Sequence, residues 1–353
     1  MWQWANRLPK IDLHRHLEGS LRLVTLTDLA RVYAIPLPSY DVEGLRPHVQ
    51  MVQDAPDFRR FIDKFELLRK FYTSREAIQR ITREAIADAA LDNIVYLELR
   101  FNPLALARVQ GFAFADVVAW VLEATAEAEQ ETGLRTCLIL QIPRQEPLAV
   151  ANEIVDIAIA NFGRWVRGVD LAGDEMTYPP ELFIEPFQRA FDAGLHITVH
   201  AGEAMGADSV RRAILYLHPQ RIGHGVRSIE NSSVIRMLYE QGMALEVCPT
   251  SNLHTGVVTT FAHHPLQDLL NLRIRVTLNT DDPGVSATTL TDEIVVSVER
   301  IGVARPAVYR MLRNAADAAF IPEEERGGLC AKLTQALADD PMGLQAFTGA
   351  VNG

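Results

Sequence analysis

Two histidines near the start of the chain have the spacing of metal ligands on a strand. Residues 9–19 read PKIDLHRHLEG, in which the apolar Ile11 and Leu13 precede and alternate with His14 and His16. Side chains at i and i+2 of an extended strand project from the same face, whereas a helix would separate them by about 200°. A strand would therefore direct both imidazoles toward one metal ion. A simple pair of histidines at the end of a strand is the alternative.

Further candidate ligands follow other strand-like segments. Active sites of α/β barrels lie at the C-terminal ends of the strands. His200 begins HAGE after the run HITVH, and Asp281 lies in NTDDP after the run RVTL. With His14 and His16 they would supply three imidazoles and one carboxylate, a donor set that suits a catalytic zinc with a position left for water. We expect these strands, the first, fifth and eighth, to be neighbours across the barrel closure. For His200 alone, a polar residue at a strand end is the alternative.

Three more polar side chains could carry the chemistry beside such a metal. Zinc lowers the pKa of bound water toward about 7, and His224 on the next strand could manage the proton of that nucleophile; a satisfied core histidine is the alternative. Glu203 would face the cavity and, protonated through burial, could act as an acid toward a substrate ring nitrogen; a helix N-terminal carboxylate is the alternative. Asp282 would point away from the metal and could hydrogen-bond a substrate N–H.

The other histidines occur in loops or at the starts of strands, and we expect them to be surface or packing residues: His48, His196, His218, His254, His263 and His264. The adjacent pair His263 and His264 has the look of a metal site. It lies in a loop between strand–helix units, however, and we expect no metal there.

Short β-rich runs alternate with helical stretches along the chain. The strand-like runs are 11–16, 94–101, 136–142, 166–171, 196–200, 221–224, 244–247 and 275–278, and the helical stretches between them include 75–91, 114–131, 147–159, 180–193 and 208–217. Strands that alternate with helices indicate parallel βαβ units, and eight of them predict an α/β fold, the (β/α)8 TIM barrel. A doubly wound sheet also fits the alternation, but no Gly-x-Gly-x-x-Gly opens the first unit.

The chain is expected to form one barrel domain over residues 1–353, because no low-complexity linker divides it. The connection at 20–92 is unusually long and is expected to hold about three helices. One of them, 57–72, has Phe58, Phe61 and Phe65 at helical spacing. Such a stripe is typical of core packing, and a lid over the barrel mouth is the alternative. The residues after 283 are expected to be helices that close and cover the barrel.

Composition excludes several classes of partner. The chain has 353 residues, 48% hydrophobic and 22% charged, as in a soluble globular protein. Its formal net charge of −11, without a basic block, argues against a nucleic-acid partner. We find neither a signal core nor an apolar run that could span a membrane. Cys137, Cys248 and Cys330 are widely spaced and suggest reduced thiols in a cytoplasmic protein. The oligomeric state is left open.

Six motifs together resemble the adenosine deaminases of the amidohydrolase superfamily: LHRHLEG, LAGDE, HAGE, GHG, CPTSN and NTDDPG, in this order. The resemblance extends from about Pro9 to the C-terminal helices. It implies a (β/α)8 barrel with one zinc ion per subunit, bound by His14, His16, His200 and Asp281. It also implies substrate contacts from His16, Glu18, Gly173 and Asp282, with the Gly173 backbone at purine N3 and Asp282 at N7, and catalytic roles for Glu203 and His224.

The reaction implied by the resemblance is the hydrolytic deamination of adenosine, and of 2′-deoxyadenosine, in purine salvage. The small-molecule partner is thus a purine nucleoside. Hydroxide attacks C6, Glu203 protonates N1, and ammonia leaves a tetrahedral intermediate to give inosine. His224 lies beside the zinc-bound water in this scheme.

One residue departs from the family pattern. Many adenosine deaminases have Asp where this chain has Glu18, and there it hydrogen-bonds the ribose 5′-hydroxyl. If the first strand persists, Glu18 shares a face with His14 and His16. Relatives that act on adenine or on 6-amino-6-deoxyfutalosine often carry Glu here, so these substrates are alternatives. Adenine deaminases tend to differ at LAGDE, GHG and NTDDPG, which this chain keeps.

Other readings are less consistent with the residues. A binuclear amidohydrolase with a carbamylated lysine after strand four is disfavoured, because no lysine lies between residues 71 and 331. Deaminases of the cytidine and tRNA type use Pro-Cys-x-x-Cys, which is absent. A nucleoside-binding protein without turnover is the non-enzyme alternative. Retention of Glu203, His224 and every candidate ligand favours the enzyme.

Overall fold

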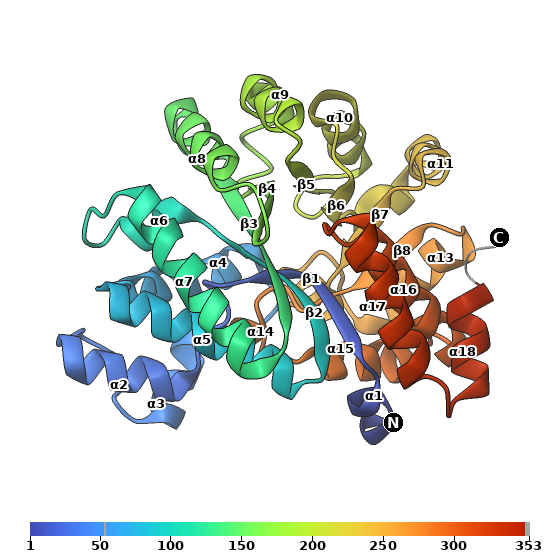
Figure 1. The fold of residues 1–353 in the computed structure, drawn as a ribbon, viewed down its shortest axis with the longest axis horizontal. Helices are drawn as coiled ribbons and strands as arrows, with labels where there is room; N and C mark the ends of the chain where they lie inside the picture. The colour runs from blue at the N-terminus through green and yellow to red at the C-terminus, as the bar shows by residue number, and fades with distance from the viewer. Residues whose placement is uncertain (53, 350–353) are drawn as a thin grey trace.

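Eight parallel strands form a barrel surrounded by helices (Figure 1). The computed structural model describes residues 1–52 and 54–349. The strands pair in chain order: β1 (Lys10–His16), β2 (Ile94–Phe101), β3 (Arg135–Pro143), β4 (Val166–Ala172), β5 (His196–Ala201), β6 (Arg221–His224), β7 (Ala244–Val247) and β8 (Arg275–Leu278). Each differs from its predicted range by at most one residue at either end. The predicted (β/α)8 TIM barrel is confirmed.

The barrel closes through residues that sequence analysis assigns to the site. Arg15 forms a parallel bridge with Asp281, just beyond the end of β8. The Asp281 amide donates to the carbonyl of His14 at 2.7 Å, and the His16 amide donates to the carbonyl of Asp281 at 2.8 Å. The backbone that joins the first strand to the last thus also fixes the positions of three candidate ligands.

Amphipathic helices cover the outside of the barrel: α5 (Arg75–Leu91), α7 (Phe114–Thr132), α8 (Leu148–Ala160), α9 (Ile184–Asp192), α10 (Ala207–Leu217), α11 (Ser232–Gln241), α13 (Leu266–Asn271) and α16 (Arg305–Ala318). In α5 the Ser74 side chain accepts from the Ala77 amide and caps the helix, while Ile78, Ile81 and Ala85 are buried at helical spacing. The predicted helix 180–193 is divided into the 3-10 turn η2 (Pro180–Phe183) and α9.

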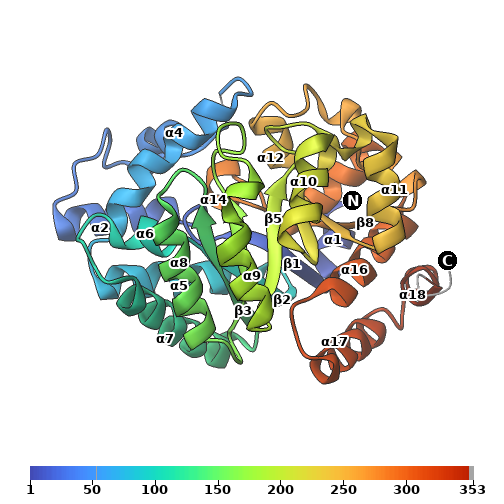
Figure 2. The same ribbon diagram turned by 90° about the horizontal axis from the view of Figure 1, so that it is seen from above.

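The long connection between β1 and β2 contains α2 (Leu23–Tyr33), α3 (Val42–Val49), α4 (Phe58–Leu68) and α5, so it holds four α-helices rather than three. The predicted helix 57–72 is shorter, because α4 passes into the 3-10 turn η1 (Arg69–Phe71). Its Phe61 and Phe65 are buried and also line the central cavity. Figure 2 shows α4 at the upper edge of the molecule, near α12 (Pro249–His254).

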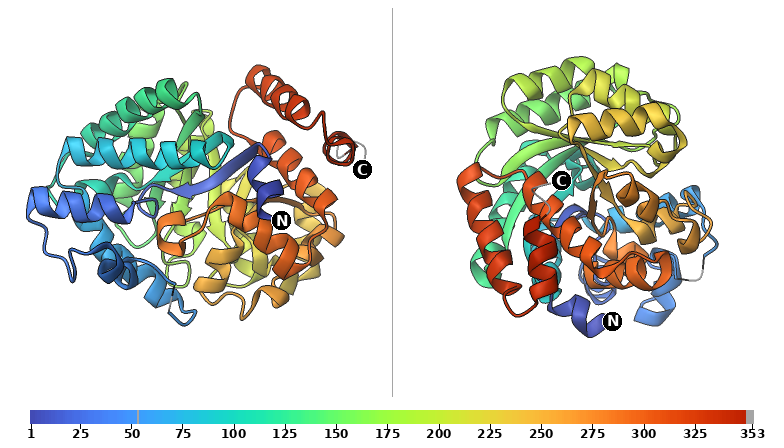
Figure 3. Two further views of the ribbon diagram at one scale, coloured as in Figure 1. Left: turned by 90° about the horizontal axis from the view of Figure 1, so that it is seen from below. Right: turned by 90° about the vertical axis from the view of Figure 1, so that its right-hand side faces the viewer.

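The chain after β8 forms α14 (Pro283–Ser286), α15 (Leu290–Val296), the π-helical turn η5 (Ser297–Ile301), α16, α17 (Glu323–Ala336) and α18 (Pro341–Thr348). Helix α16 packs against β8 and β1, as expected of the helix that follows the last strand. By contrast, α17 and α18 pack on α16 and lie at the edge of the molecule (Figure 3). The prediction that the tail covers the barrel holds for α15 and α16, which contact β8, while α17 reaches the barrel through the ion pair of Glu325 with Arg135 of β3 at 2.8 Å.

The remaining short elements are α1 (Trp2–Arg7), α6 (Pro103–Ala107), η3 (Val226–Glu230) and η4 (Phe261–His263). Among the described residues, no helix combines the length and apolar character needed to cross a membrane. Cys137, Cys248 and Cys330 are free thiols, the first two of them buried.

Candidate active site

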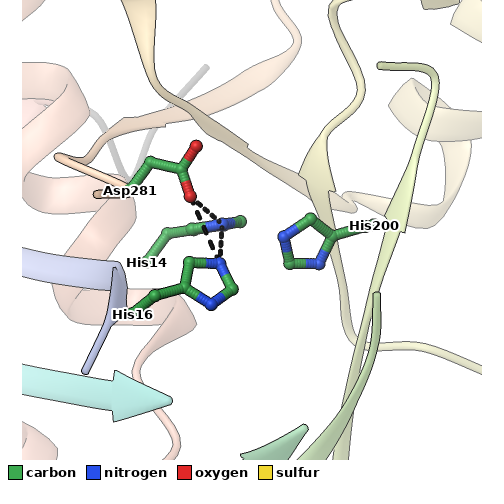
Figure 4. A group of neighbouring side chains, drawn as sticks. All are labelled: His14, His16, His200 and Asp281. Carbon is green, nitrogen blue, oxygen red and sulfur yellow. Dashed lines mark hydrogen bonds and ion pairs between the residues drawn. The ribbon is translucent and has the colours of Figure 1, made fainter. Parts of the chain in front are cut away.

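Four predicted ligands converge at the C-terminal end of the barrel. One nitrogen or oxygen atom from each of His14, His16, His200 and Asp281 lies within 4.8 Å of the others, and all four residues are buried. The Nε2 atoms of His14 and His16 are each 3.2 Å from Oδ1 of Asp281. Figure 4 shows the three rings and the carboxylate facing a common centre. The geometry suits one metal ion with nitrogen and oxygen donors.

The prediction that strands one, five and eight are neighbours is wrong for β5. Strand β5 pairs with β4 and β6, and it lies across the barrel from β1. In Figure 4 His200 accordingly faces the other three side chains from the opposite side. The ligands still meet, because side chains at the ends of barrel strands point over the barrel axis.

A second partner orients each of the three candidate histidine ligands. The contacts at Nδ1 are His14 to Glu246 Oε2 at 2.7 Å, His16 to Gln141 Oε1 at 3.0 Å, and His200 to Asp170 Oδ1 at 3.0 Å. Because these oxygens accept, each Nδ1 carries the proton and each Nε2 lone pair is left for a metal. The orientation of all three rings therefore fits a bound cation.

Electrostatics at the cluster also favour positive charge. Burial raises the pKa of Asp281, but hydrogen bonds from His14 and His16 outweigh burial and hold it well below its usual value. Burial lowers the pKa of His16, yet the carboxylates of Asp282 and Asp281 raise it overall to about 9. At His200 burial dominates and lowers the pKa to about 3, so this ring is neutral. A metal cation would satisfy the same negative field.

One buried arginine connects the carboxylates behind His14 and His200. Arg100 donates from Nη1 to Asp170 at 3.2 Å and from Nη2 to Glu246 at 2.9 Å. Arg100, Asp170 and Glu246 are fully buried. Although burial raises the pKa of each carboxyl, both pKa values are held well below their usual range, at Glu246 by Arg100 and Arg221 and at Asp170 by His200 and Arg100. Sequence analysis missed this network. Its signal in the sequence is that Arg100, Asp170 and Glu246 are charged residues within the mostly apolar strands β2, β4 and β7.

Glu203 lies in the loop between β5 and α10 and lines the cavity. Helix α10 begins at Ala207, so Glu203 is not in its first turn and the helix N-terminal alternative does not apply. Burial, together with the nearby charges of Asp281 and Glu175, raises the pKa of Glu203 to about 8. The group is therefore a neutral acid at pH 7 and can donate a proton into the cavity.

The loop that carries Glu203 is held by a carboxylate that sequence analysis did not assign. Glu175 accepts from the amides of Gly202 at 2.7 Å, Glu203 at 3.3 Å and Met205 at 3.0 Å. Glu175 is the last residue of the motif LAGDE, so the sequence singled out this residue but did not predict that it binds the loop of Glu203. The contacts fix the direction in which the Glu203 side chain enters the cavity.

His224, the last residue of β6, is buried next to the cluster. Its Nε2 lies 3.6 Å from Oε2 of Glu203 and 3.8 Å from Oδ2 of Asp281. Burial lowers the pKa of this ring. His224 has φ +57° and Asp281 has φ +63°, in the left-handed region that costs a non-glycine residue about 1 kcal/mol or more. Such strain is concentrated at functional sites, where the surrounding structure fixes it.

The cavity has two carboxyl groups with an unsatisfied oxygen. Glu18 accepts from the Asn102 amide at 2.8 Å through Oε1, while Oε2 has no partner, and Oδ1 of Asp282 has none either. Burial raises the pKa of both carboxyls, and the charge of Asp281 adds to the effect at Asp282. Strand β1 ends at His16, so the strand does not persist to Glu18, yet Glu18 lines the same cavity. A Cβ on Gly19 would lie 1.8 Å from Oδ1 of Asp282, so this position requires glycine.

Apolar side chains of α4 form one wall of the cavity, and Gly173 lines a different part of it. The cavity contains about 720 Å³ of empty space, part of it open to solvent. Gly173 has φ +105°, and a Cβ there would lie 2.3 Å from Oε1 of Gln145. Gly173 is itself exposed and lines the cavity, so its backbone is accessible to a ligand. Aromatic walls with a few polar groups suit a flat heterocycle.

The other histidines do not belong to the cluster. His196 stacks on Phe320 with ring centroids 4.5 Å apart, as a packing residue. Within residues 1–52 and 54–349, neither His263 nor His264 takes part in a group of potential metal ligands. His264 is nevertheless buried and contacts Asn252 at 3.2 Å, so its role goes beyond that of a surface residue.

Comparisons with known proteins agree with this architecture. A family model described as adenosine deaminase matches residues 9–336. An adenosine deaminase from Shigella dysenteriae is 38% identical over 326 residues, which cover 92% of this chain and 98% of the relative. The crystal structure of an adenine deaminase from Arthrobacter aurescens has a TM-score of 0.87 and 28% identity, covering 94% of this chain and 99% of that one. The crystal structure of a Zn-bound amidohydrolase from Burkholderia ambifaria has a TM-score of 0.86 and 26% identity, and the match covers 96% of this chain and 95% of that one. The chain belongs to the adenosine deaminase family.

Proposed function

We propose that this protein catalyses the zinc-dependent hydrolytic deamination of adenosine and 2′-deoxyadenosine, a reaction of purine salvage that releases ammonia. The observation that carries the proposal is the position of a neutral acid, Glu203, in the same cavity as the ligand cluster and His224. Deamination of a purine at C6 requires an activated water on one side and a proton for a ring nitrogen on the other. The cavity has a candidate for each.

The metal of the proposal is zinc, held by His14, His16, His200 and Asp281. The donor set of three imidazoles and a carboxylate is typical of catalytic zinc, and the Burkholderia ambifaria relative contains Zn. When bound, zinc supplies a nucleophilic hydroxide at neutral pH by lowering the pKa of water. Glu246, Gln141 and Asp170 keep the three rings in the orientation that such binding needs.

The protein's own groups would hold the purine as follows. Glu203 donates its proton to N1, which makes C6 more electrophilic. Asp282, whose pKa is raised by burial and by the charge of Asp281, contacts N7, and the backbone of Gly173 contacts N3. His224 lies on the nucleophile's side of the cavity, between Glu203 and Asp281.

A second substrate class is supported by Glu18 and by the adenine deaminase relative. Glu18 lines the cavity and its buried Oε2 has no hydrogen-bond partner, so this oxygen is available to a group on the sugar side of the purine. Adenine and 6-amino-6-deoxyfutalosine are therefore alternative substrates. A nucleoside-binding protein without turnover is disfavoured, because Glu203 and His224 have the geometry that turnover needs.

The test combines metal analysis with a substrate panel. Purified protein is expected to contain one zinc per chain and to release ammonia from adenosine. Adenosine, 2′-deoxyadenosine, adenine, 5′-substituted adenosines and 6-amino-6-deoxyfutalosine are then ranked by kcat/KM. A clear preference for adenine would overturn the adenosine assignment, and a folded, zinc-loaded protein that releases no ammonia from the panel would overturn the enzyme assignment.

A further inference from the structure

A chain of three buried side chains extends from His224 away from the cavity. Nδ1 of His224 lies 3.1 Å from Nδ2 of Asn252, and Oδ1 of Asn252 lies 3.2 Å from Nε2 of His264. At the far end, the backbone amide of Leu266 donates to Nδ1 of His264 at 3.1 Å. The exposed fractions of His224, Asn252 and His264 are 1%, 0% and 4%. Solvent therefore cannot substitute for any contact in the series.

The direction of every hydrogen bond in this series follows from its last member. A backbone N–H can only donate, so Nδ1 of His264 accepts and carries no proton. Burial lowers the pKa of His264 to about 3, so the ring is neutral and its single proton is on Nε2. That N–H donates to Oδ1 of Asn252. The amide then has only its NH₂ group to offer to His224, and Nδ1 of His224 must accept.

We propose that His264 and Asn252 are positioning residues that hold His224 in the tautomer with its proton on Nε2. This N–H lies on the cavity side of the ring, near Oε2 of Glu203 and Oδ2 of Asp281. In this tautomer His224 donates a hydrogen bond toward the cavity and offers no lone pair there. It would orient the nucleophilic oxygen rather than remove its proton. The catalytic part of the inference rests on the proposed deaminase function, while the tautomer does not.

The local fold explains why the terminal donor is available. Leu266 is the first residue of α13, and the first amides of a helix have no partner within the helix. His264 has an extended backbone, φ −70° and ψ 128°, as expected before Pro265. The extended residue turns its ring toward Asn252 in α12, the last residue of the motif CPTSN. The connection between β7 and β8 thus supplies Asn252, His264 and the Leu266 amide, every member of the series beyond His224.

The most direct test is Asn252→Asp, which changes shape little and reverses one hydrogen bond. Both oxygens of a carboxylate accept hydrogen bonds. One oxygen of the new carboxylate would accept from Nε2–H of His264, so the other can bond to Nδ1 of His224 only if that nitrogen carries a proton. Nitrogen-15 NMR of histidine-labelled, zinc-loaded protein distinguishes protonated from non-protonated ring nitrogens. The His224 signals are identified by their loss in His224→Asn. We expect Nε2–H for His224 in the parent protein and Nδ1–H in Asn252→Asp.

Kinetics provide a second readout. Holding a catalytic histidine in the wrong tautomer lowers kcat by up to about 10⁴-fold in a serine protease, and we expect Asn252→Asp to lower kcat by about 10²-fold or more with KM nearly unchanged. In His264→Gln the side-chain amide nitrogen can replace Nε2 as the donor, so the tautomer and most of the kcat are retained. His264→Leu removes the donor to Asn252, so this variant should lose both the parent tautomer of His224 and most of the kcat. His263→Gln, at the exposed neighbouring position, is the matched control and should leave both unchanged.

Two results would overturn the inference. One is a parent spectrum in which His224 carries its proton on Nδ1. The other is a His264→Leu protein, folded and loaded with zinc, that keeps the parent tautomer and the parent kcat. If Asn252→Asp fails to fold, the parent spectrum and the two His264 variants still decide the question. If the protein deaminates no substrate in the panel, the proposed function fails while the NMR measurement still tests the tautomer.

Discussion

Oε2 of Glu246 lies 2.7 Å from Nδ1 of His14, and the two residues are separated by 232 positions in the chain. The same oxygen accepts from Nη2 of Arg100 at 2.9 Å, and Thr198 donates to the other oxygen of the carboxylate at 2.9 Å. Glu246 therefore has two functions: it sets the tautomer of a candidate ligand, and it neutralises two buried arginines, Arg100 and Arg221, the second of which donates from Nε to Oε1 at 2.5 Å. The site and the polar interior of the barrel share this residue.

Glu246→Gln and Gln141→Leu are expected to separate these functions. Each removes or weakens the acceptor behind one histidine, and changes of this kind cost about 10–100-fold in metal affinity. Glu246→Gln also removes a buried charge from Arg100 and should lower the free energy of unfolding by about 3–5 kcal/mol. Gln141→Leu breaks no ion pair and should change stability far less. Chelator competition measures the zinc affinity and urea unfolding measures the stability.

Gln145→Leu is the control for this pair, because Gln145 lines the same cavity beside Gly173 rather than behind a histidine. It should leave zinc affinity unchanged. Parent-like zinc binding in Gln141→Leu would show that the contact to His16 does not support the metal.

His200→Ala is expected to lower zinc occupancy strongly, because it removes the one ligand that reaches the cluster from across the barrel. His196 begins the same strand and stacks on Phe320, so His196→Ala should keep its zinc and serves as the matched control. Metal analysis of the two purified variants makes the comparison. Equal zinc contents would mean that the ligand set is wrong.

Glu203→Gln is expected to retain zinc and to lose about 10²–10⁴-fold in kcat, the usual contribution of a positioned acid. Glutamine keeps the size of the side chain but has no acidic proton to give to N1. Asp208→Asn changes the exposed acid in the first turn of α10 and should leave kcat unaltered. Steady-state kinetics at saturating adenosine test both variants, and near-normal turnover of Glu203→Gln would remove this residue from the mechanism.

The strands and the ligand cluster could be predicted from the sequence because both have local signals. Strands buried on both faces appear as apolar runs, and His14, His16 and His200 follow such runs directly. Glu246, Asp170 and Arg100 are charged residues within such runs, and nothing local says which histidine each carboxylate meets or which carboxylates Arg100 joins. Those contacts join residues from 30 positions apart, as His200 and Asp170 are, to 232 positions apart, as His14 and Glu246 are, and they depend on register and barrel closure.

The errors and omissions have the same origin. A spacing pattern carries no information on which strand lies opposite another, so β5 was placed next to β1. The four-helix connection and the outer position of α17 and α18 depend on tertiary packing rather than periodicity. The expectation that His264 is a surface or packing residue rests on its loop location, which does not separate the two; its burial and its contact with Asn252 appear only in the folded chain.

The pH dependence of kcat/KM should have a descending limb near pH 8. Glu203 acts in its protonated form, and burial with the charges of Asp281 and Glu175 raises its pKa to about 8. Below this pH the acid is present, and above it kcat/KM should fall about tenfold per pH unit as the proton is lost. The descending limb should be present in the pH profile of the parent protein and absent from that of Glu203→Gln. A limb of the same position and slope in both proteins would assign it to another group.

Glu18→Asp should shift the choice of substrate rather than the chemistry. Glu18 lines the cavity, its Oε1 accepts from the Asn102 amide, and its Oε2 has no hydrogen-bond partner. Removing one methylene withdraws that oxygen by about 1.5 Å, the length of a C–C bond, and recreates the residue common in adenosine deaminases. We expect kcat/KM for adenosine to rise or hold while kcat/KM for substrates with a larger 5′ substituent falls at least severalfold. Zinc content and the pH profile should not change. If the ratio between the two substrates is the same in Glu18→Asp as in the parent, Glu18 does not contact the sugar end of the substrate.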